Sequence, residues 1–121
     1  MTFQTIRKRL KAVGLPTAHF EFRATKKNPI PKPPYMVWFH TDRVSGSDDK
    51  NRIRTIEGSI ELYTDLLDLT PEENEVQREV IESAIEQTVL FDVDYTKFMV
   101  PIHEENLFQT AYEFTLTERI K

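Results

Sequence analysis

Cysteine is absent from this chain of 121 residues, and glycine and tryptophan are scarce, with three residues and one residue respectively. The absence of cysteine excludes disulfides, thiol nucleophiles and thiolate metal sites, and it is compatible with a reducing compartment. With so few glycines, a loop that brings several backbone amides to one phosphate is difficult to build. No apolar run approaches the roughly 20 residues that span a bilayer. The basic N-terminal segment also lacks the apolar core of a signal peptide, so we expect a soluble protein that is made without export.

The composition is that of one folded unit. Hydrophobic residues make up 39% of the chain and charged residues 30%, which is typical of a globular protein. The length suits a single domain over residues 1–121 with one hydrophobic core.

Charge is divided unevenly along the chain. Residues 1–54 contain twelve lysines and arginines against four acidic residues, whereas residues 55–121 contain four against sixteen. Two interpretations remain open. The two segments can lie beside each other and neutralise each other within one fold, or the folded surface can be basic on one side and acidic on the other. The second arrangement favours contacts in which the basic side of one copy meets the acidic side of the next.

Helical spacing and alternation define the start of the chain. Phe3, Ile6, Leu10 and Val13 recur every three or four residues, which predicts an amphipathic helix that ends at Gly14. The period then changes to two over residues 17–25, which predicts a first strand with one buried face.

A hairpin is expected next. Residues 26–34 hold four of the seven prolines and predict a stiff surface loop. Residues 35–40 are apolar without alternation, which predicts a strand buried on both faces in the middle of a sheet. The polar residues 41–51 predict a mobile loop at the tip of a long hairpin, and the alternation over residues 52–63 predicts the returning strand. Gly58 falls on the apolar side of that strand, which indicates a bulge or a close neighbour.

A second helix has the clearest start signal in the chain. Thr70, Pro71 and Glu73 have the spacing of a capping box with proline at the first helical position. The helix is expected to bury an apolar stripe made of Val76, Val80, Ile81, Ala84 and Ile85.

Two further strands complete the pattern. Alternation over residues 91–96 predicts a fourth strand, which residues 98–101 either extend or leave. Residues 103–106 predict a turn, and the alternation of Phe108, Tyr112, Phe114 and Leu116 predicts a fifth strand. The order helix, three strands, helix, two strands predicts an α+β domain with a mostly antiparallel or mixed sheet and helices packed on it.

The sequence contains no constellation typical of catalysis or metal binding. His19, His40 and His103 lie in different segments, and no nucleophile motif or pair of histidines at helical spacing is present. Asp92 and Asp94 are expected to share one solvated strand face. We therefore expect no enzyme activity, no cofactor and no metal ion.

Nucleic-acid binding is an alternative that the basic first third raises. Its lysines and arginines could contact phosphates, and nearby aromatic residues could stack on bases. The aromatic residues fall on predicted core faces, however, and the net charge of the whole chain is −4. Direct nucleic-acid binding is therefore disfavoured.

The order of segments resembles that of a known family. A proline-rich approach feeds the hydrophobic strand in PPYMVWFH, a polar loop precedes the strand that ends in SIELYTD, and the chain closes after a helix with LFQTAYEFTL. In this order and at this length, these stretches resemble the small tail-terminator, or tail-completion, proteins of siphophages and related prophages. The segment FDVDYTKFMVPIHEEN departs from the family pattern, so the pairing of strands in that region is open.

The resemblance implies an assembly role. Members of the family form a ring, commonly a hexamer, that caps the tail tube, stops its polymerisation and joins the tail to the head connector. The expected partners are thus other copies of the chain, the tail-tube protein and the head connector, and the expected location is the head–tail junction of a virion assembled in the bacterial cytoplasm. Another head–tail connector or a minor capsid protein would fit the same pattern. The candidate partner-binding residues lie in two loops: Arg43, Ser45, Asp48, Asp49, Lys50 and Arg52 in the first, and Lys26, Lys27 and Lys32 in the second.

Overall fold

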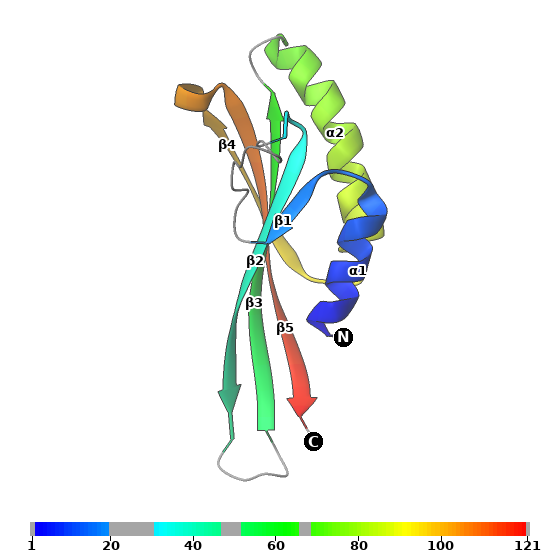
Figure 1. Ribbon diagram of the computed structural model, residues 1–121, viewed down its shortest axis with the longest axis vertical. Helices are drawn as coiled ribbons and strands as arrows, with labels where there is room; N and C mark the ends of the chain where they lie inside the picture. The colour runs from blue at the N-terminus through cyan, green and yellow to red at the C-terminus, as the bar shows by residue number, and fades with distance from the viewer. Residues whose placement is uncertain (1, 20–30, 47–51, 66–68, 121) are drawn as a thin grey trace.

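In the described part of the chain, the computed structural model has one mixed sheet and two helices, arranged as in Figure 1. The structure describes residues 2–19, 31–46, 52–65 and 69–120. The elements are α1 (Phe3–Val13), β1 (Thr17–His19), β2 (Tyr35–Ser45), β3 (Arg52–Asp65), α2 (Pro71–Thr88), β4 (Tyr95–Ile102), a short 3₁₀ turn η1 (His103–Glu105) and β5 (Leu107–Ile120). This order confirms the predicted α+β class.

The strands lie in the order β1-β2-β3-β5-β4. β1 runs parallel to β2, and every other neighbouring pair is antiparallel. Both helices lie on the same face of the sheet, side by side (Figure 1). The opposite face carries no helix in the described part of the chain.

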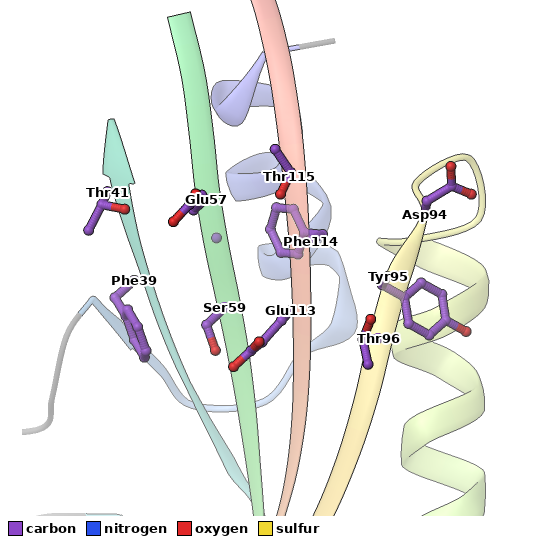
Figure 2. Close-up of a pocket in the computed structure, with 11 residues that line it drawn as sticks. Phe39, Thr41, Glu57, Ser59, Asp94, Tyr95, Thr96, Glu113, Phe114 and Thr115 are labelled. Carbon is purple, nitrogen blue, oxygen red and sulfur yellow. The ribbon is translucent and has the colours of Figure 1, made fainter. Parts of the chain in front are cut away.

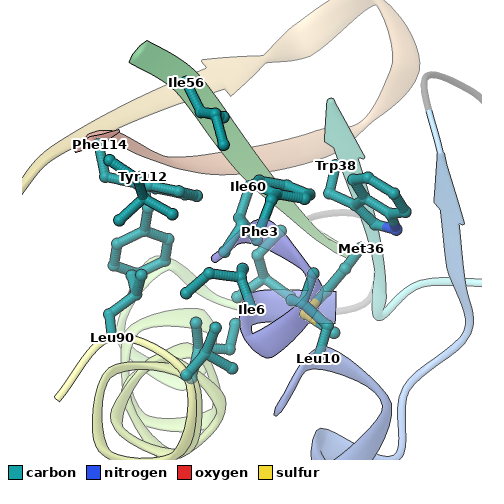
Figure 3. Packing of buried hydrophobic residues seen from close by; sticks show 14 residues of the cluster. Phe3, Ile6, Leu10, Met36, Trp38, Ile56, Ile60, Leu90, Tyr112 and Phe114 are labelled. Atoms are coloured by element: carbon teal, nitrogen blue, oxygen red, sulfur yellow. The ribbon is translucent and has the colours of Figure 1, made fainter. Parts of the chain in front are cut away.

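The hydrophobic core fills the space between the helices and the sheet (Figure 3). From α1 it takes the predicted apolar row, with Phe3, Ile6 and Leu10 buried. Gly14 ends this helix at φ 85°, a left-handed conformation that glycine adopts without steric cost. The other members of this core cluster in the described residues are Met36, Trp38, Ile56, Ile60, Leu62, Ile85, Val89, Leu90, Tyr112, Phe114 and Leu116.

Contacts outside the core fasten α1 to the rest of the molecule. The backbone amide of Phe3 donates to Oε1 of Glu118 at 3.3 Å, which places a carboxylate at the positive end of the helix. On the other side, Arg9 donates to the carbonyl of Val89 at 3.1 Å and pairs with Asp92 at 2.7 Å. The hydrogen bond from Arg9 lowers the pKa of the Asp92 carboxyl. The basic first half and the acidic second half of the chain thus meet within the fold at these points.

The strand boundaries correct two predictions. Residues 41–45, assigned to the loop, continue β2, because Thr41 to Ser45 pair in register with Glu57 to Ile53 of β3. Residues 91–94, assigned to the fourth strand, form a turn, and β4 begins at Tyr95. Asp92 therefore does not share a strand face with Asp94. Its carboxylate pairs instead with Arg9 of α1.

The buried face of α2 corrects a third prediction. Of the expected stripe, Ile85 is buried and Ile81 is partly buried, whereas Val76 and Val80 are 65% and 69% exposed. Asn74 and Glu82 are buried in their place. Ala84 is exposed as well. Hydrogen bonds and ion pairs with the sheet hold the polar side chains inward, so hydrophobic periodicity alone predicts a stripe that is rotated from the buried face and shares only Ile81 and Ile85 with it.

Other predictions in this part are confirmed. The capping box of Thr70 and Glu73 is present in both directions, and three consecutive residues of β2, Met36 to Trp38, are buried. β2 lies between β1 and β3, as expected for an interior strand. The predicted first strand, residues 17–25, is described only as far as His19.

Gly58 marks a close contact between neighbouring strands. It pairs with Phe114 of β5, and a Cβ atom at Gly58 would lie 2.6 Å from the Phe114 ring. That ring is buried and stacks with Phe3 at a centroid distance of 6.2 Å. The strand continues in regular register through Gly58, so the glycine provides space for the ring and forms no bulge.

Replacing Gly58 with valine should lower the free energy of unfolding by about 1–3 kcal/mol, because the added atoms overpack the Phe114 ring. Denaturant unfolding followed by circular dichroism measures this change. Thr117→Val, on an exposed position of β5, is the control and should shift stability by no more than about 0.5 kcal/mol. Equal stability of the two variants would contradict the packing account.

Candidate functional site

The β2–β3 hairpin is the first candidate surface. β2, β3 and β5 extend beyond the N-terminal end of α1, so this end of the sheet projects past the helical layer (Figure 1). Arg43 and Ser45 are exposed on β2, together with Val44 at 51%. The structure therefore exposes those two predicted residues, on a strand rather than on a loop.

The remaining predicted residues are only partly described. Asp48, Asp49 and Lys50 lie outside the described residues, and so do Lys26 and Lys27. Arg52 opens β3, but its side chain is outside the described part. Lys32 is exposed on the segment that leads into β2. The structure does not establish that any of these residues come together in one site.

The open face of the sheet is a second candidate surface, which sequence reasoning missed. A hollow of about 760 Å³ lies over its central strands. Figure 2 shows Phe39, Ser59 and Glu113 along the hollow, on three different strands. Glu57 and Asp94 also line it, and its lining within the described residues includes no basic side chain. The hollow is thus aromatic and acidic, which suits a cationic partner.

A polar cluster lies on the same face, further along β3 and β5. Gln109 donates to Oε2 of Glu61 at 2.7 Å and to the hydroxyl of Tyr63 at 3.0 Å. Tyr63 donates to Oε1 of Glu61 at 3.3 Å and stacks on Tyr35 at 5.2 Å. Burial raises the pKa of Glu61, and the nearby charge of Glu113 adds to this effect. Burial and the Glu61 carboxylate raise the pKa of Tyr63 to about 12.

The difference in unfolding free energy between Glu61→Gln and the unchanged chain should favour the variant more at neutral pH than at acidic pH. The raised pKa means that folded Glu61 holds its proton more tightly than unfolded Glu61, so native stability is lost as the pH rises through this window. The glutamine has no proton to lose, so its advantage should appear only above the ordinary glutamate pKa. Denaturant unfolding of both proteins at several pH values measures the difference, and a gain that does not depend on pH would contradict this account.

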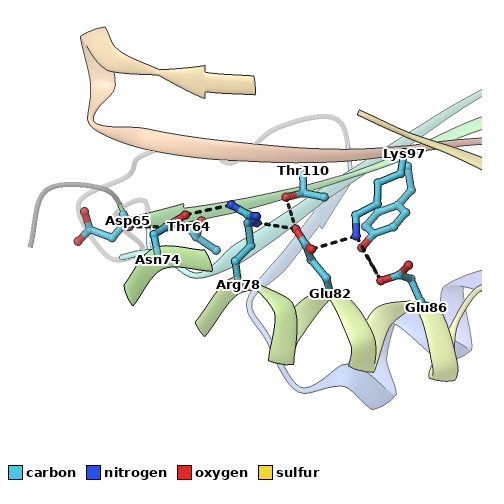
Figure 4. Close-up of polar contacts among 9 residues, drawn as sticks. Thr64, Asp65, Asn74, Arg78, Glu82, Glu86, Lys97 and Thr110 are labelled. Atoms are coloured by element: carbon cyan, nitrogen blue, oxygen red, sulfur yellow. Dashed lines mark hydrogen bonds and ion pairs between the residues drawn. The ribbon is translucent and has the colours of Figure 1, made fainter. Parts of the chain in front are cut away.

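α2 is held on the sheet by a buried ionic network (Figure 4). Glu82 is 2% exposed and accepts from Nε of Arg78 at 2.9 Å, from Nζ of Lys97 at 2.9 Å and from the hydroxyl of Thr110 at 2.7 Å. Arg78 also donates to Oδ1 of Asn74 at 3.1 Å. The charge of Glu82 is therefore fully compensated. The sequence signal that could have identified this row is the four-residue spacing of Asn74, Arg78, Glu82 and Glu86.

Glu82→Ala should lower the free energy of unfolding by about 3–5 kcal/mol, because it leaves Arg78 and Lys97 without their shared partner in a buried position. Thermal and denaturant unfolding measure the loss. Glu75→Ala is the matched control, since Glu75 lies on the same helix, is exposed and should change stability by no more than about 0.5 kcal/mol. A similar effect of both substitutions would argue against the network.

A groove of about 740 Å³ separates the first half of α2 from β4 and β5. Its lining is largely apolar, with Leu69, Met99 and Phe108 among the lining residues. The Arg78 guanidinium lies 4.3 Å above the Phe108 ring and gives the groove its one basic group within the described chain. His103 also lines the groove, and it belongs to no group of potential metal ligands among the described residues.

Histidines and carboxylates do not converge in the described ranges. Nδ1 of His40 lies 2.7 Å from Oδ1 of Asp42, next to the Phe3 ring. The side chain of His19 is outside the described part. Residues 2–19, 31–46, 52–65 and 69–120 contain no group of three histidines or acidic residues arranged to hold a metal ion. No helix among them has the length and apolar character needed to cross a membrane.

Comparisons with known proteins add no assignment. No protein-family model matches the chain, and no curated protein matches it in sequence.

Proposed function

We propose that this chain is a non-catalytic assembly subunit that forms a ring, caps the tail tube of a long-tailed bacteriophage, ends tube polymerisation and joins the tail to the head connector. Within the virion it would lie at the head–tail junction. The resemblance of the segment order to siphophage tail terminators supports this role, and it also supports a hexameric ring.

The sheet face that carries no helix within residues 2–19, 31–46, 52–65 and 69–120 is the observation on which the proposal depends most. A subunit that works through partners needs a surface that its own chain leaves uncovered. Here the open face combines the acidic hollow with Phe98 and Val100 of β4, which are 47% and 48% exposed. Exposed apolar residues beside a polar rim are typical of protein–protein contacts.

The edges of the sheet support termination. A protein that ends polymerisation should not offer a long free strand on which more subunits can add. β4 forms one edge and contains Pro101, which has no backbone amide to donate to a further strand. β1 forms the other edge, and it spans three residues as far as the structure describes it.

Removing residues 45–50 should leave a folded protein that fails to complete tails, because the tip of the projecting hairpin is a candidate contact with the tube or the connector. Infectious-particle yield in a complementation assay measures the failure, and circular dichroism checks the fold. Glu104→Ala, an exposed change in the η1 turn, is the control and should give the unchanged yield. Normal yield from the shortened chain would contradict the assigned role of the hairpin.

Electron microscopy of the defective particles separates the two candidate roles within this class. Loss of termination should give tubes of excessive and variable length. Tubes of normal length that remain unattached to heads would instead assign the chain to a head–tail connector.

A further inference from the structure

The outer side of α2 is apolar and acidic, whereas the side it buries combines the polar Asn74 and Glu82 with the apolar Ile85. Val76 and Val80 are one helical turn apart and are 65% and 69% exposed. Glu72, Glu73 and Glu79 are exposed on the same helix. The only basic residue of α2, Arg78, turns inward to Glu82. The exposed surface of this helix is therefore a small apolar row among negative charges.

The outer side of α1 has the opposite charge. The helix contains no acidic residue, and Arg7, Lys8 and Lys11 are exposed on it. Lys8 and Lys11 flank Ala12, a small exposed side chain that permits close approach by another helix. The methylene chains of lysine can cover apolar side chains while their ammonium groups reach nearby carboxylates.

These two outer sides cannot meet within one molecule. α1 and α2 lie side by side on the same sheet face (Figure 1), and they are joined by Arg9, which donates to the carbonyl of Val89 near the end of α2. Lys8 and Lys11 are exposed in that arrangement, and so are Val76 and Val80. Each copy thus presents one basic and one acidic helical surface to other molecules.

We infer that the outer side of α1 in one copy docks on the outer side of α2 in the next copy, and that this contact is the repeating interface of the assembly. Lysine side chains cover Val76 and Val80, and their ammonium groups pair with Glu72 and Glu79. Because the two surfaces differ, the contact is head-to-tail and propagates from copy to copy until a ring closes. The inference rests on the ring of the proposed function, and it specifies the surface that builds the ring.

The charges on this interface allow a test by exchange. Lys8→Glu with Lys11→Glu places carboxylates opposite Glu72 and Glu79 of the next copy, and Glu72→Lys with Glu79→Lys places ammonium groups opposite Lys8 and Lys11. Each double variant should lose self-association, with an apparent dissociation constant raised at least about tenfold, because like charges then face each other. Size-exclusion chromatography with light scattering at low salt measures this, and thermal unfolding confirms that each variant is folded.

Mixing the two double variants is the decisive measurement. In the mixture, the substituted α1 of one variant can meet the substituted α2 of the other, and their two unchanged helices can also meet. Assemblies of alternating copies should therefore form. A single chain that carries all four substitutions should also assemble, with an affinity within about threefold of the unchanged chain if the charges act mainly as pairs. Val76→Ser with Val80→Ser keeps the charges and removes the apolar row, so it should weaken assembly. Mixing this variant with either charge variant should not restore assembly.

Three results would overturn the inference. Unchanged assembly of both double variants would mean that another surface builds the ring, and tail completion by these variants would leave the proposed function intact. Two monomeric variants that stay monomeric on mixing would mean that a different protein, or nucleic acid on α1, occupies these helices. If the unchanged chain remains monomeric in the assay, the proposed contact between copies does not form. The tail-completion assay then tests the proposed function separately.

Discussion

The carboxylate of Glu82 determines which way α2 faces. It lies 2% exposed between Arg78, Lys97 and Thr110, and every one of these contacts links α2 either to itself or to the sheet. An unpaired charge in this position would be costly, so the helix has one rotation that satisfies it. The consequence is that Val76 and Val80 point outward. A polar interaction in the interior thus creates an apolar row on the surface.

Charge segregation along the chain has two different outcomes in the fold. Where elements from the two halves of the sequence are in contact, opposite charges pair, as Arg9 does with Asp92 and Arg54 does with Glu118. On the outer sides of the helices they remain separate, with cations on α1 and carboxylates on α2. The first interpretation of the sequence is therefore confirmed at these ion pairs, and contact between the basic and acidic sides of different copies stays a prediction. The open sheet face adds a second acidic surface, which leaves room for a partner other than a copy of the chain.

Local signals in the sequence predicted the fold well because they are decided by neighbouring residues. The helix cap at Thr70, the helix end at Gly14 and the close contact at Gly58 each follow from residues near in sequence or from the shape of one residue. The length of β2 was not predictable in this way, since polar residues such as Thr41 become strand through pairing with β3. The candidate site was harder still. Glu61, Tyr63 and Gln109 come from two strands and meet only through the register of the sheet.

The single tryptophan gives the molecule a built-in optical reporter. Trp38 lies under the first turn of α1, with the Phe3 ring at 5.3 Å and the Arg7 guanidinium at 5.5 Å from its own ring. Its emission therefore depends on whether the inner side of α1 is seated on the sheet. Lys8 and Lys11 lie on the other side of that helix, away from the indole, so events there leave the reporter undisturbed. Trp38 fluorescence consequently follows detachment of the helix and stays unchanged when a neighbour docks on its outer side.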